Sequence, residues 1–168
     1  VPSFILWGPP GVGKTTLAQI VAKTLDRPFY TLSAVTSGVK DVREVIDKAK
    51  RQHLFNARPA FLFIDEIHRF NKSQQDSLLG AVEQGVITLI GATTENPSFE
   101  VISPLLSRCQ VYVLKPMEDA DLDTLLQRAL TTDEELLKRN IEVKEREALF
   151  RFSGGDARKL LNILDIVV

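Results

Sequence analysis

The stretch from Gly8 to Thr15, Gly-Pro-Pro-Gly-Val-Gly-Lys-Thr, constrains the fold of this chain more than any other feature. It follows a short apolar run that predicts a strand, residues 4–7, and it precedes a segment of helical character from Leu17. A glycine-rich loop between a strand and a helix lets successive backbone N–H groups turn inward around an oxyanion. The helix adds the partial positive charge of its N-terminus. This order of elements predicts a site for the phosphates of a nucleotide.

Two side chains of the loop supply further chemistry for such a site. Lys14 brings a full positive charge to the β- and γ-phosphates, and the Thr15 hydroxyl is a ligand that suits Mg²⁺. We therefore expect a nucleoside triphosphate and Mg²⁺ as cofactors. The residues of the loop expected to bind the nucleotide are Gly8, Pro9, Pro10, Gly11, Val12, Gly13, Lys14, Thr15 and Thr16.

Composition and charge are those of an ordinary globular chain. The 168 residues are 44% hydrophobic and 26% charged, which suits one domain with a small appendage. The formal net charge of −1 provides no broad basic field that would attract nucleic acid. The single cysteine, Cys109, excludes an internal disulfide and favours a reducing compartment, so we expect a cytoplasmic protein.

Neither terminus nor any internal run has the pattern of a membrane protein. No apolar run is long enough to cross a bilayer, and the first residues lack a signal-peptide pattern. The chain starts on an apolar run without a methionine, which indicates a fragment of a longer protein. We therefore expect no membrane partner.

Strand and helix patterns alternate up to Lys115. Most of the strand-like runs are continuously apolar, which is typical of parallel strands covered on both faces. Gly85 stands where a glycine commonly ends a helix. The pattern predicts an α/β fold with a doubly wound, five-stranded parallel sheet. The predicted strands are residues 4–7, 29–32, 61–64, 87–92 and 111–114, and the predicted helices are 14–25, 39–52, 73–83 and a short one near 102–106.

After Pro116 the strands cease and only helical patterns follow. Residues 132–135, Thr-Asp-Glu-Glu, have the pattern of a capping box that opens a helix at Thr132. We therefore predict a nucleotide-binding domain over residues 1–115 and a small helical lid domain over residues 116–168. The other helices predicted in the lid are residues 118–130, 144–152 and 156–168.

A second chemical signal follows the third predicted strand, which leads directly into Asp65 and Glu66. The carboxyl ends of parallel strands face the ligand crevice of an open α/β sheet. Asp65 is expected to hold Mg²⁺ together with Thr15, largely through water. Glu66 is expected to orient the attacking water and accept its proton.

The residues after this pair favour ATP over GTP. A GTPase would have Asp-x-x-Gly at this point, whereas Asp65 and Glu66 are followed by Ile67 and His68. Guanine recognition would also need Asn-Lys-x-Asp, and residues 71–74 are Asn-Lys-Ser-Gln, without the carboxylate.

Three polar residues follow the fourth predicted strand, at a place where a side chain can reach between the γ-phosphate and the attacking water. Thr93 is the first choice for this role, followed by Thr94 and Asn96. We also expect Asn96 to contribute to nucleotide binding.

Two arginines complete the candidate site. Arg108 follows the short helix and precedes the last strand, so it is expected at the edge of the domain, where it can enter the site of a neighbouring subunit. Arg158 lies in the first turn of the final helix and is expected to touch the γ-phosphate from the lid. The expected catalytic residues are thus Lys14, Glu66, Thr93, Arg108 acting in trans, and Arg158.

Together these residues resemble the nucleotide site of AAA+ ATPases. They fill the Walker A, Walker B, sensor 1, arginine-finger and sensor 2 positions in the family's order, over nearly the whole chain. Residues 33–40, 65–76 and 91–99 resemble, more narrowly, the replication-associated recombination protein A family (RarA, also called MgsA), which is akin to the Werner-helicase-interacting ATPase. That family is related to clamp-loader subunits and to the Holliday-junction branch-migration motor.

The resemblance implies a DNA-dependent ATPase that acts in replication-fork maintenance, recombination and repair as a tetramer. It implies forked, single-stranded or end DNA as a partner, with replication and single-strand-binding proteins, and association with the nucleoid if the protein is bacterial. In such ATPases a segment before the first strand helps to hold adenine, and by the resemblance we expect this segment to be missing from the sequence at hand. By the same resemblance we expect the C-terminal domain through which the family tetramerises to be missing, and this chain alone to be chiefly monomeric.

Three alternatives stay open. One is a clamp-loader or Holliday-junction motor subunit with the same site. Another is a small P-loop kinase acting on a metabolite, which would need neither the Asp65–Glu66 pair nor an arginine at the edge. The last is an ATP switch that does not hydrolyse, against which the presence of Glu66 and Arg108 argues.

Overall fold

The chain folds as two compact units in a computed structural model that describes residues 1–55, 58–139 and 141–168. The first unit consists of Val1–Gly8 and Lys14–Val113. The second consists of Pro9–Gly13 and Leu114–Val168. The middle of the glycine-rich loop therefore belongs, by its contacts, with the C-terminal helices.

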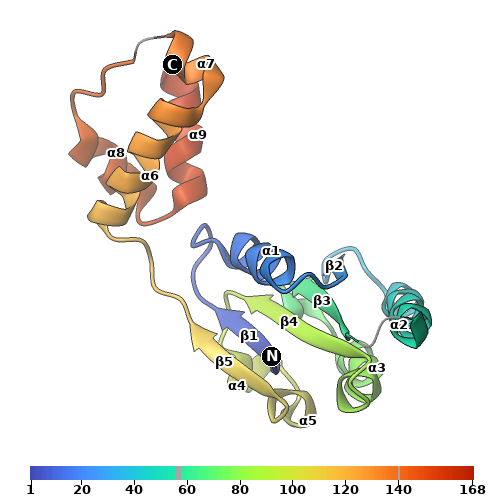
Figure 1. The fold of residues 1–168 in the computed structure, drawn as a ribbon. Helices are drawn as coiled ribbons and strands as arrows, with labels where there is room; N and C mark the ends of the chain where they lie inside the picture. The colour runs from blue at the N-terminus through green and yellow to red at the C-terminus, as the bar shows by residue number, and fades with distance from the viewer. Residues whose placement is uncertain (56–57, 140) are drawn as a thin grey trace. The chain divides into compact units, whose positions relative to one another are not determined.

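The first unit is built on a parallel sheet with the strand order β2-β3-β4-β1-β5 (Figure 1). Strands β3 and β4 lie side by side inside the sheet and are buried along almost their whole length. This confirms the predicted five-stranded α/β fold. The strands are β1 (Ser3–Trp7), β2 (Phe29–Ser33), β3 (Ala60–Asp65), β4 (Ile87–Thr93) and β5 (Cys109–Val113).

Helices cover both faces of this sheet. The long predicted helices are present, and Gly85, with φ +67°, follows the end of the third in the left-handed conformation that glycine favours. Two short helices, η1 and α4, have no counterpart in the prediction because three or four residues are too few to show a periodicity. The helices are α1 (Lys14–Thr24), α2 (Val39–Phe55), η1 (Ile67–Arg69), α3 (Lys72–Glu83), α4 (Pro97–Glu100) and α5 (Ser103–Leu106).

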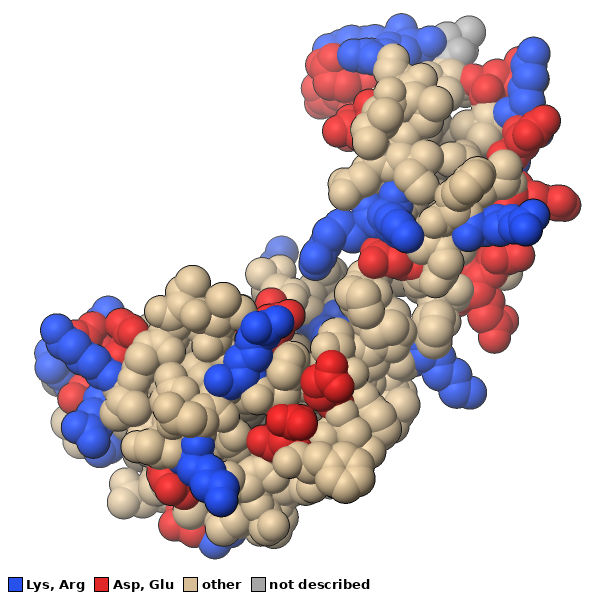
Figure 2. Space-filling model, turned by 180° about the vertical axis from the view of Figure 1, so that it is seen from behind, with Lys and Arg blue, Asp and Glu red and all other residues tan. Residues whose placement is uncertain are grey.

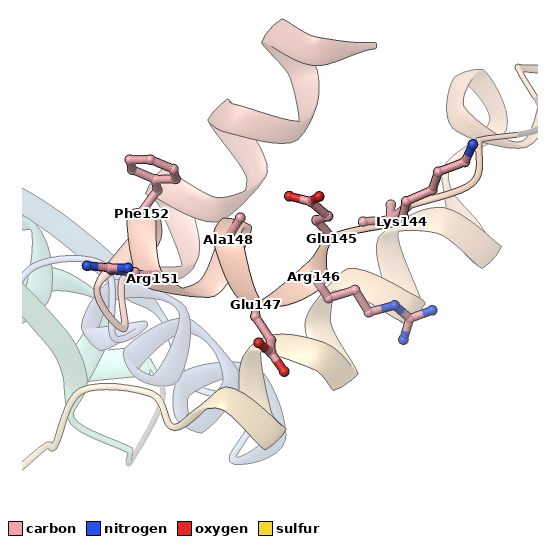
Figure 3. A pocket seen from close by; sticks show the side chains of 8 residues that line it. Lys144, Glu145, Arg146, Glu147, Ala148, Arg151 and Phe152 are labelled. Carbon is pink, nitrogen blue, oxygen red and sulfur yellow. The ribbon is translucent and has the colours of Figure 1, made fainter.

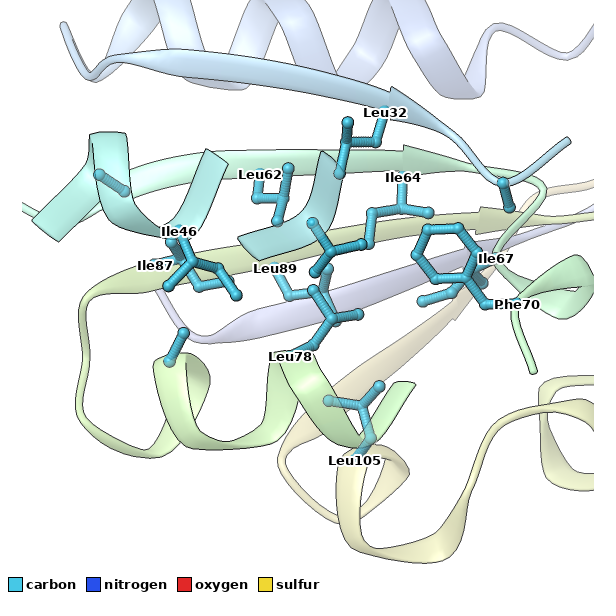
Figure 4. Packing of buried hydrophobic residues seen from close by; sticks show 14 of the residues in the cluster. Leu32, Ile46, Leu62, Ile64, Ile67, Phe70, Leu78, Ile87, Leu89 and Leu105 are labelled. Atoms are coloured by element: carbon cyan, nitrogen blue, oxygen red, sulfur yellow. The ribbon is translucent and has the colours of Figure 1, made fainter. Parts of the chain in front are cut away.

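Successive residues of each strand point to opposite faces of the sheet. The core of the first unit forms where apolar side chains on one face pack against the helices. On the face shown in Figure 4, Leu62 and Leu89 pack against Leu78 of α3 and Ile46 of α2. All four side chains are buried, and each contributes about 1.5–3 kcal/mol to stability by leaving water. This packing covers one face of the sheet with α2 and α3.

The second unit is a small helical bundle. Its core residues are Leu122 and Leu126 of α6, Phe150 of α8, and Leu160 and Leu164 of α9. None of the helices in the described parts of the chain has both the length and the apolar composition that a membrane span requires. The helices are α6 (Asp119–Thr132), α7 (Glu134–Lys138), α8 (Arg146–Ser153) and α9 (Ala157–Val167).

The predicted capping box at Thr132 is wrong. Thr132 is the last residue of α6, and its hydroxyl donates to the carbonyl oxygen of Arg128 at 2.7 Å, so its side chain serves the preceding helix. The cap of α7 is Asp133 instead, whose Oδ1 accepts from the backbone N–H groups of Glu135 and Leu136 at 3.0 and 3.1 Å.

Candidate active site

The carboxyl ends of β1, β3 and β4 bring the start of the glycine-rich loop, Asp65 and Thr93 to one edge of the sheet. Trp7, the last residue of β1, is in register with Thr93, the last residue of β4. The N–H of Gly8 donates to the Thr93 carbonyl oxygen at 3.1 Å. On the other side of β4, strand β3 ends at Asp65. Because the strands are parallel, these ends share the edge at which open α/β sheets bind ligands.

Lys14 and Thr15 open helix α1 beside this edge. The Lys14 ammonium donates to the Gly8 carbonyl oxygen at 2.8 Å, so the positive charge of Lys14 lies beside the first residue of the loop. Lys14 and Thr15 are half-buried, and Thr16 is exposed. The first turn of α1 contains no acidic residue that would neutralise the N-terminal end of the helix. These features suit a bound phosphate group.

The chain turns sharply after Asp65. The Asp65 carboxylate accepts from the N–H of Glu66 at 3.1 Å, and Glu66 itself has φ 53° and ψ 45°. This left-handed conformation is unfavourable for a residue with a side chain and persists only where neighbouring structure holds it. Oε2 of Glu66 lies 2.7 Å from Nε of Arg69, one turn further on. The candidate base therefore has a defined partner and a strained backbone.

The polar residues at the end of β4 differ in how they are placed. Thr93 is only 1% exposed, and its hydroxyl contacts the N–H of Glu95 at 3.0 Å, the carbonyl oxygen of Glu95 at 3.1 Å and Nδ1 of His68 at 3.0 Å. The Thr94 side chain is exposed. Asn96 caps α4 by accepting from the N–H of Ser98 at 3.0 Å. The choice of Thr93 stays a prediction, and Thr94 offers the exposed hydroxyl at this strand end.

Arg108 lies at the opposite edge of the sheet. The next residue, Cys109, is in register with Ser3 at the start of β1. At about 3.3 Å per residue, roughly 16 Å of strand separates Ser3 from Gly8. The exposed Arg108 guanidinium pairs with the Glu83 carboxylate and donates to the Pro104 carbonyl oxygen at 2.6 Å. This position fits the expectation that Arg108 serves a neighbouring subunit rather than its own loop.

Inside the second unit, the middle of the glycine-rich loop contacts the start of α9. The N–H of Ala157 donates to the Gly11 carbonyl oxygen at 3.2 Å. Asp156 caps α9 by accepting from the N–H of Lys159 at 3.0 Å. Arg158 follows Ala157 directly and is exposed. The loop and the predicted sensor arginine are therefore neighbours within one unit.

We expect Gly11→Ala to weaken this contact. Gly11 has φ +72°, and a Cβ there would lie 1.7 Å from Oδ1 of Asp156. Gly13→Ala is the matched control, because Gly13 also has a positive φ, +87°, but its Cβ would meet nothing within 4 Å. Each substitution adds about 1–2 kcal/mol of backbone strain. Thermal unfolding should show a lower midpoint for Gly11→Ala than for Gly13→Ala, and equal midpoints would contradict the overlap with Asp156.

Other reactive groups lie outside this arrangement. Burial raises the pKa of the Cys109 thiol to about 11, so the thiol stays protonated and is a poor nucleophile. Within the described residues, no three His, Cys, Asp or Glu side chains gather closely enough to hold a metal ion. The expected Mg²⁺ site therefore rests on Thr15 and Asp65, and this suits an ion that commonly takes one or two carboxylates with phosphate and water.

One cavity of the described structure lies away from the predicted site. A cavity of about 890 Å³ beside α8 is lined by residues 143–148, 151 and 152, none of which belongs to the predicted site (Figure 3). Its Arg146 is paired with Asp123 at 2.8 Å. On the face shown in Figure 2, basic and acidic side chains are interspersed on each unit. No single-sign surface for nucleic acid is visible on that face.

Comparison with known proteins shows the family to which this chain belongs. Residues 4–117 match the ATPase family associated with various cellular activities (AAA). The chain is 51% identical over 168 residues to replication-associated recombination protein A of Coxiella burnetii, covering 98% of this chain and 38% of that protein. It is 52% identical over 170 residues to ATPase WRNIP1 of Dictyostelium discoideum, covering 100% of this chain and 19% of that protein. The chain thus spans less than two fifths of the length of these relatives.

Solved structures agree with this assignment. The Holliday junction branch migration motor RuvB of Thermotoga maritima superimposes with a TM-score of 0.77 at 32% identity, over 96% of this chain and 52% of that one. The parallel sheet, the loop after β1 and the carboxylate pair after β3 are consistent with these matches. This chain belongs to the AAA family of ATPases, in the branch that contains replication-associated recombination protein A and WRNIP1.

Proposed function

We propose that this chain is the ATP-binding and ATP-hydrolysing core of a DNA-dependent ATPase that acts in replication-fork maintenance, recombination and repair. The observation that carries the proposal is the edge shared by Gly8, Asp65 and Thr93, next to Lys14 at the start of α1. Membership of the AAA family supports the hydrolysis, and similarity at 48–52% identity to replication-associated recombination protein A and WRNIP1 supports the role at DNA.

In the proposed mechanism, the loop binds the phosphates, and the carboxylate pair contributes to Mg²⁺ binding and to proton transfer. Backbone N–H groups of residues 8–16 and the Lys14 ammonium bind the phosphates. Thr15 and Asp65 would hold Mg²⁺, which when bound neutralises charge on the β- and γ-phosphates. Glu66 accepts a proton from the water that attacks the γ-phosphorus, as the bond to the ADP oxygen breaks. A polar group among Thr93, Thr94 and Asn96 orients that water.

The two arginines stabilise the negative charge that spreads over the transferred group. Arg158, adjacent to the loop contact of Ala157, serves the same chain's γ-phosphate. Arg108, at the far edge of the sheet, serves a neighbouring subunit in a homo-oligomer, which we propose to be a tetramer in the full-length protein. Forked, single-stranded or end DNA and replication or single-strand-binding proteins are the proposed partners, in the cytoplasm and, in a bacterium, at the nucleoid.

The likeness to RuvB also favours a second candidate, a branch-migration motor subunit with the same site. The higher identity to replication-associated recombination protein A favours the first. The test is the ATPase rate of the full-length protein without DNA and with forked, single-stranded, duplex and four-way-junction DNA. Stimulation by forks or ends supports the first candidate, and stimulation confined to four-way junctions supports the second. Transfer of phosphate to a small acceptor instead of water would contradict both.

Lys14→Ala should abolish ATP binding, because the phosphates lose the full positive charge that the loop carries at its end beside Gly8. Lys14→Arg should rescue binding poorly, because a planar guanidinium does not fit where a compact ammonium is held 2.8 Å from a carbonyl oxygen. Equilibrium titration with a fluorescent ATP analogue measures both. An unchanged affinity in Lys14→Ala would remove Lys14 from the phosphate site.

A further inference from the structure

The short helix η1 connects the candidate base to the neighbouring strand. Glu66 immediately precedes it, in the left-handed conformation. Ile67, its first residue, is fully buried, and its side chain lies 3.2 Å from the position that a Cβ of Gly91 in β4 would occupy. His68, its second residue, contacts the Thr93 hydroxyl at the end of the same strand. Successive residues of η1 thus hold it to β4 by one apolar and one polar contact.

The third residue of η1, Arg69, contacts the candidate base, Glu66. Nε of Arg69 lies 2.7 Å from Oε2 of Glu66, and its backbone N–H donates to the Glu66 carbonyl oxygen at 2.8 Å. Whatever fixes η1 on β4 therefore also fixes the backbone and the carboxylate of Glu66. A strained backbone of this kind is retained only when surrounding contacts over-determine it.

The donor and acceptor roles of the His68 ring depend on its tautomer, and the contacts of the Thr93 hydroxyl favour one of the two. A hydroxyl has one hydrogen and two lone pairs. One lone pair accepts from the N–H of Glu95, which leaves one hydrogen and one lone pair for the Glu95 carbonyl oxygen and Nδ1 of His68. When the hydroxyl donates its one hydrogen to the carbonyl oxygen, which can only accept, its remaining lone pair takes an N–H from Nδ1. This arrangement satisfies every partner of a hydroxyl that is 1% exposed.

We infer that His68 is a positioning residue for the ATP hydrolysis proposed above. Its Nδ1–H donates to the Thr93 hydroxyl and so sets the distance between η1, which carries Glu66 into place, and the end of β4, where the water-orienting side chain lies. The inference rests on the proposed function, because the positioned groups are the proposed base and its partner across the water. His68 itself touches no reacting atom in this role.

The position of the proton is testable without any turnover. The chain contains two histidines, His53 and His68, so a His53→Asn variant assigns the ring signals in an ¹H–¹⁵N spectrum. At a pH where the His68 ring is neutral, we expect Nδ1 to be protonated and Nε2 to be the bare nitrogen. Thr93→Val removes the acceptor and should abolish this preference. A neutral ring protonated at Nε2 in the wild type would overturn the inference.

Turnover tests the consequence in the full-length protein, with a matched pair of variants. An Asn side chain places its amide N–H near the position of Nδ1, whereas a Gln side chain reaches further, to the region of Nε2. His68→Gln and His68→Ala should lower kcat by about 10- to 100-fold, the scale of a misplacement near 1 Å, and should leave the ATP Kd unchanged. His68→Asn should retain most of kcat. Thermal unfolding of each variant shows that it is folded at the assay temperature.

The coupling to Thr93 separates positioning from a general loss of structure. In a Thr93→Val background, His68→Ala should have no further effect on kcat, because its partner is already absent. Additive losses, or a His68→Asn variant as slow as His68→Ala, would overturn the inference. If the wild type itself does not hydrolyse ATP, the proposed function fails, and the tautomer measurement still decides the hydrogen bond on its own.

Discussion

Arg108→Ala in the full-length protein is expected to bind ATP as tightly as the wild type and to hydrolyse it about 10³–10⁵ times more slowly. That factor corresponds to roughly 4–7 kcal/mol of activation free energy. The position of Arg108 explains the separation of binding from turnover. It lies beside the start of β1, whereas the phosphate loop follows the end of the same strand, so loss of its charge leaves the chain's own binding residues untouched.

Mixing variants tests whether Arg108 acts between subunits. An Arg108→Ala subunit has an intact loop, and a Lys14→Ala subunit has an intact arginine. In a mixed oligomer the first can bind ATP and receive the arginine of the second, so part of the activity should return. Neither variant alone contains such a pair. Subunit exchange must be shown independently, for example by fluorescence transfer between labelled subunits.

The ion pair with Glu83 supplies a control that only the structure reveals. Within the described chain, Arg108 pairs with the Glu83 carboxylate at the end of α3. If this pair were the purpose of Arg108, Glu83→Ala would be as slow as Arg108→Ala. Action in trans instead predicts a Glu83→Ala variant with near wild-type turnover, because the freed guanidinium remains available. No recovery on mixing exchanged subunits, or equal losses in the two variants, would contradict the role in trans.

Glu66→Gln is expected to keep ATP and Mg²⁺ bound and to lower turnover by about 10²–10⁴-fold, the usual contribution of a general base. The amide preserves the shape of the side chain but cannot accept the proton of the attacking water. Asp65→Asn should behave differently, by weakening the dependence of ATP binding on Mg²⁺ while the base remains. Nucleotide titrations at several Mg²⁺ concentrations, together with phosphate release, measure the two effects separately.

Arg69→Ala is the matched control for Glu66→Gln. The substitution at Glu66 removes both the base and the charge that Arg69 contacts at 2.7 Å. Arg69→Ala removes only the ion pair, so it should lose much less turnover than Glu66→Gln. If Arg69→Ala were equally slow, the ion pair and not proton transfer would account for the loss. A Glu66→Gln variant that hydrolyses ATP at the wild-type rate would exclude Glu66 as the base.

The sequence by itself determined the elements that depend on local chemistry. The glycines and Lys14 between an apolar run and a helix defined a phosphate loop, since that function needs only neighbouring residues. Continuous apolar runs such as residues 61–64 indicated buried parallel strands, because both faces of such strands are covered. Since parallel strands end at a common edge, Asp65 and Thr93 could also be placed together in advance.

Local sequence patterns gave a wrong prediction at Thr132 and missed two short helices. Thr132 fits a capping box in sequence, yet its hydroxyl bonds back to Arg128 and Asp133 caps the next helix. The helices η1 and α4 were missed because their three or four residues carry no periodic signal. At Thr132 the deciding interaction is a hydrogen bond to the preceding turn, which becomes available only when that turn has formed.

Only the tertiary structure decided which distant side chains meet. The strand order β2-β3-β4-β1-β5 sets β4 between the loop strand and the carboxylate strand, and this brings His68 to the Thr93 hydroxyl across 25 residues of sequence. In the same unit Arg108 pairs with Glu83, and within the second unit Gly11 meets the start of α9. Such contacts follow from how the helices bury their apolar faces against the sheet and one another. That packing depends on the whole chain, so no local stretch encodes it.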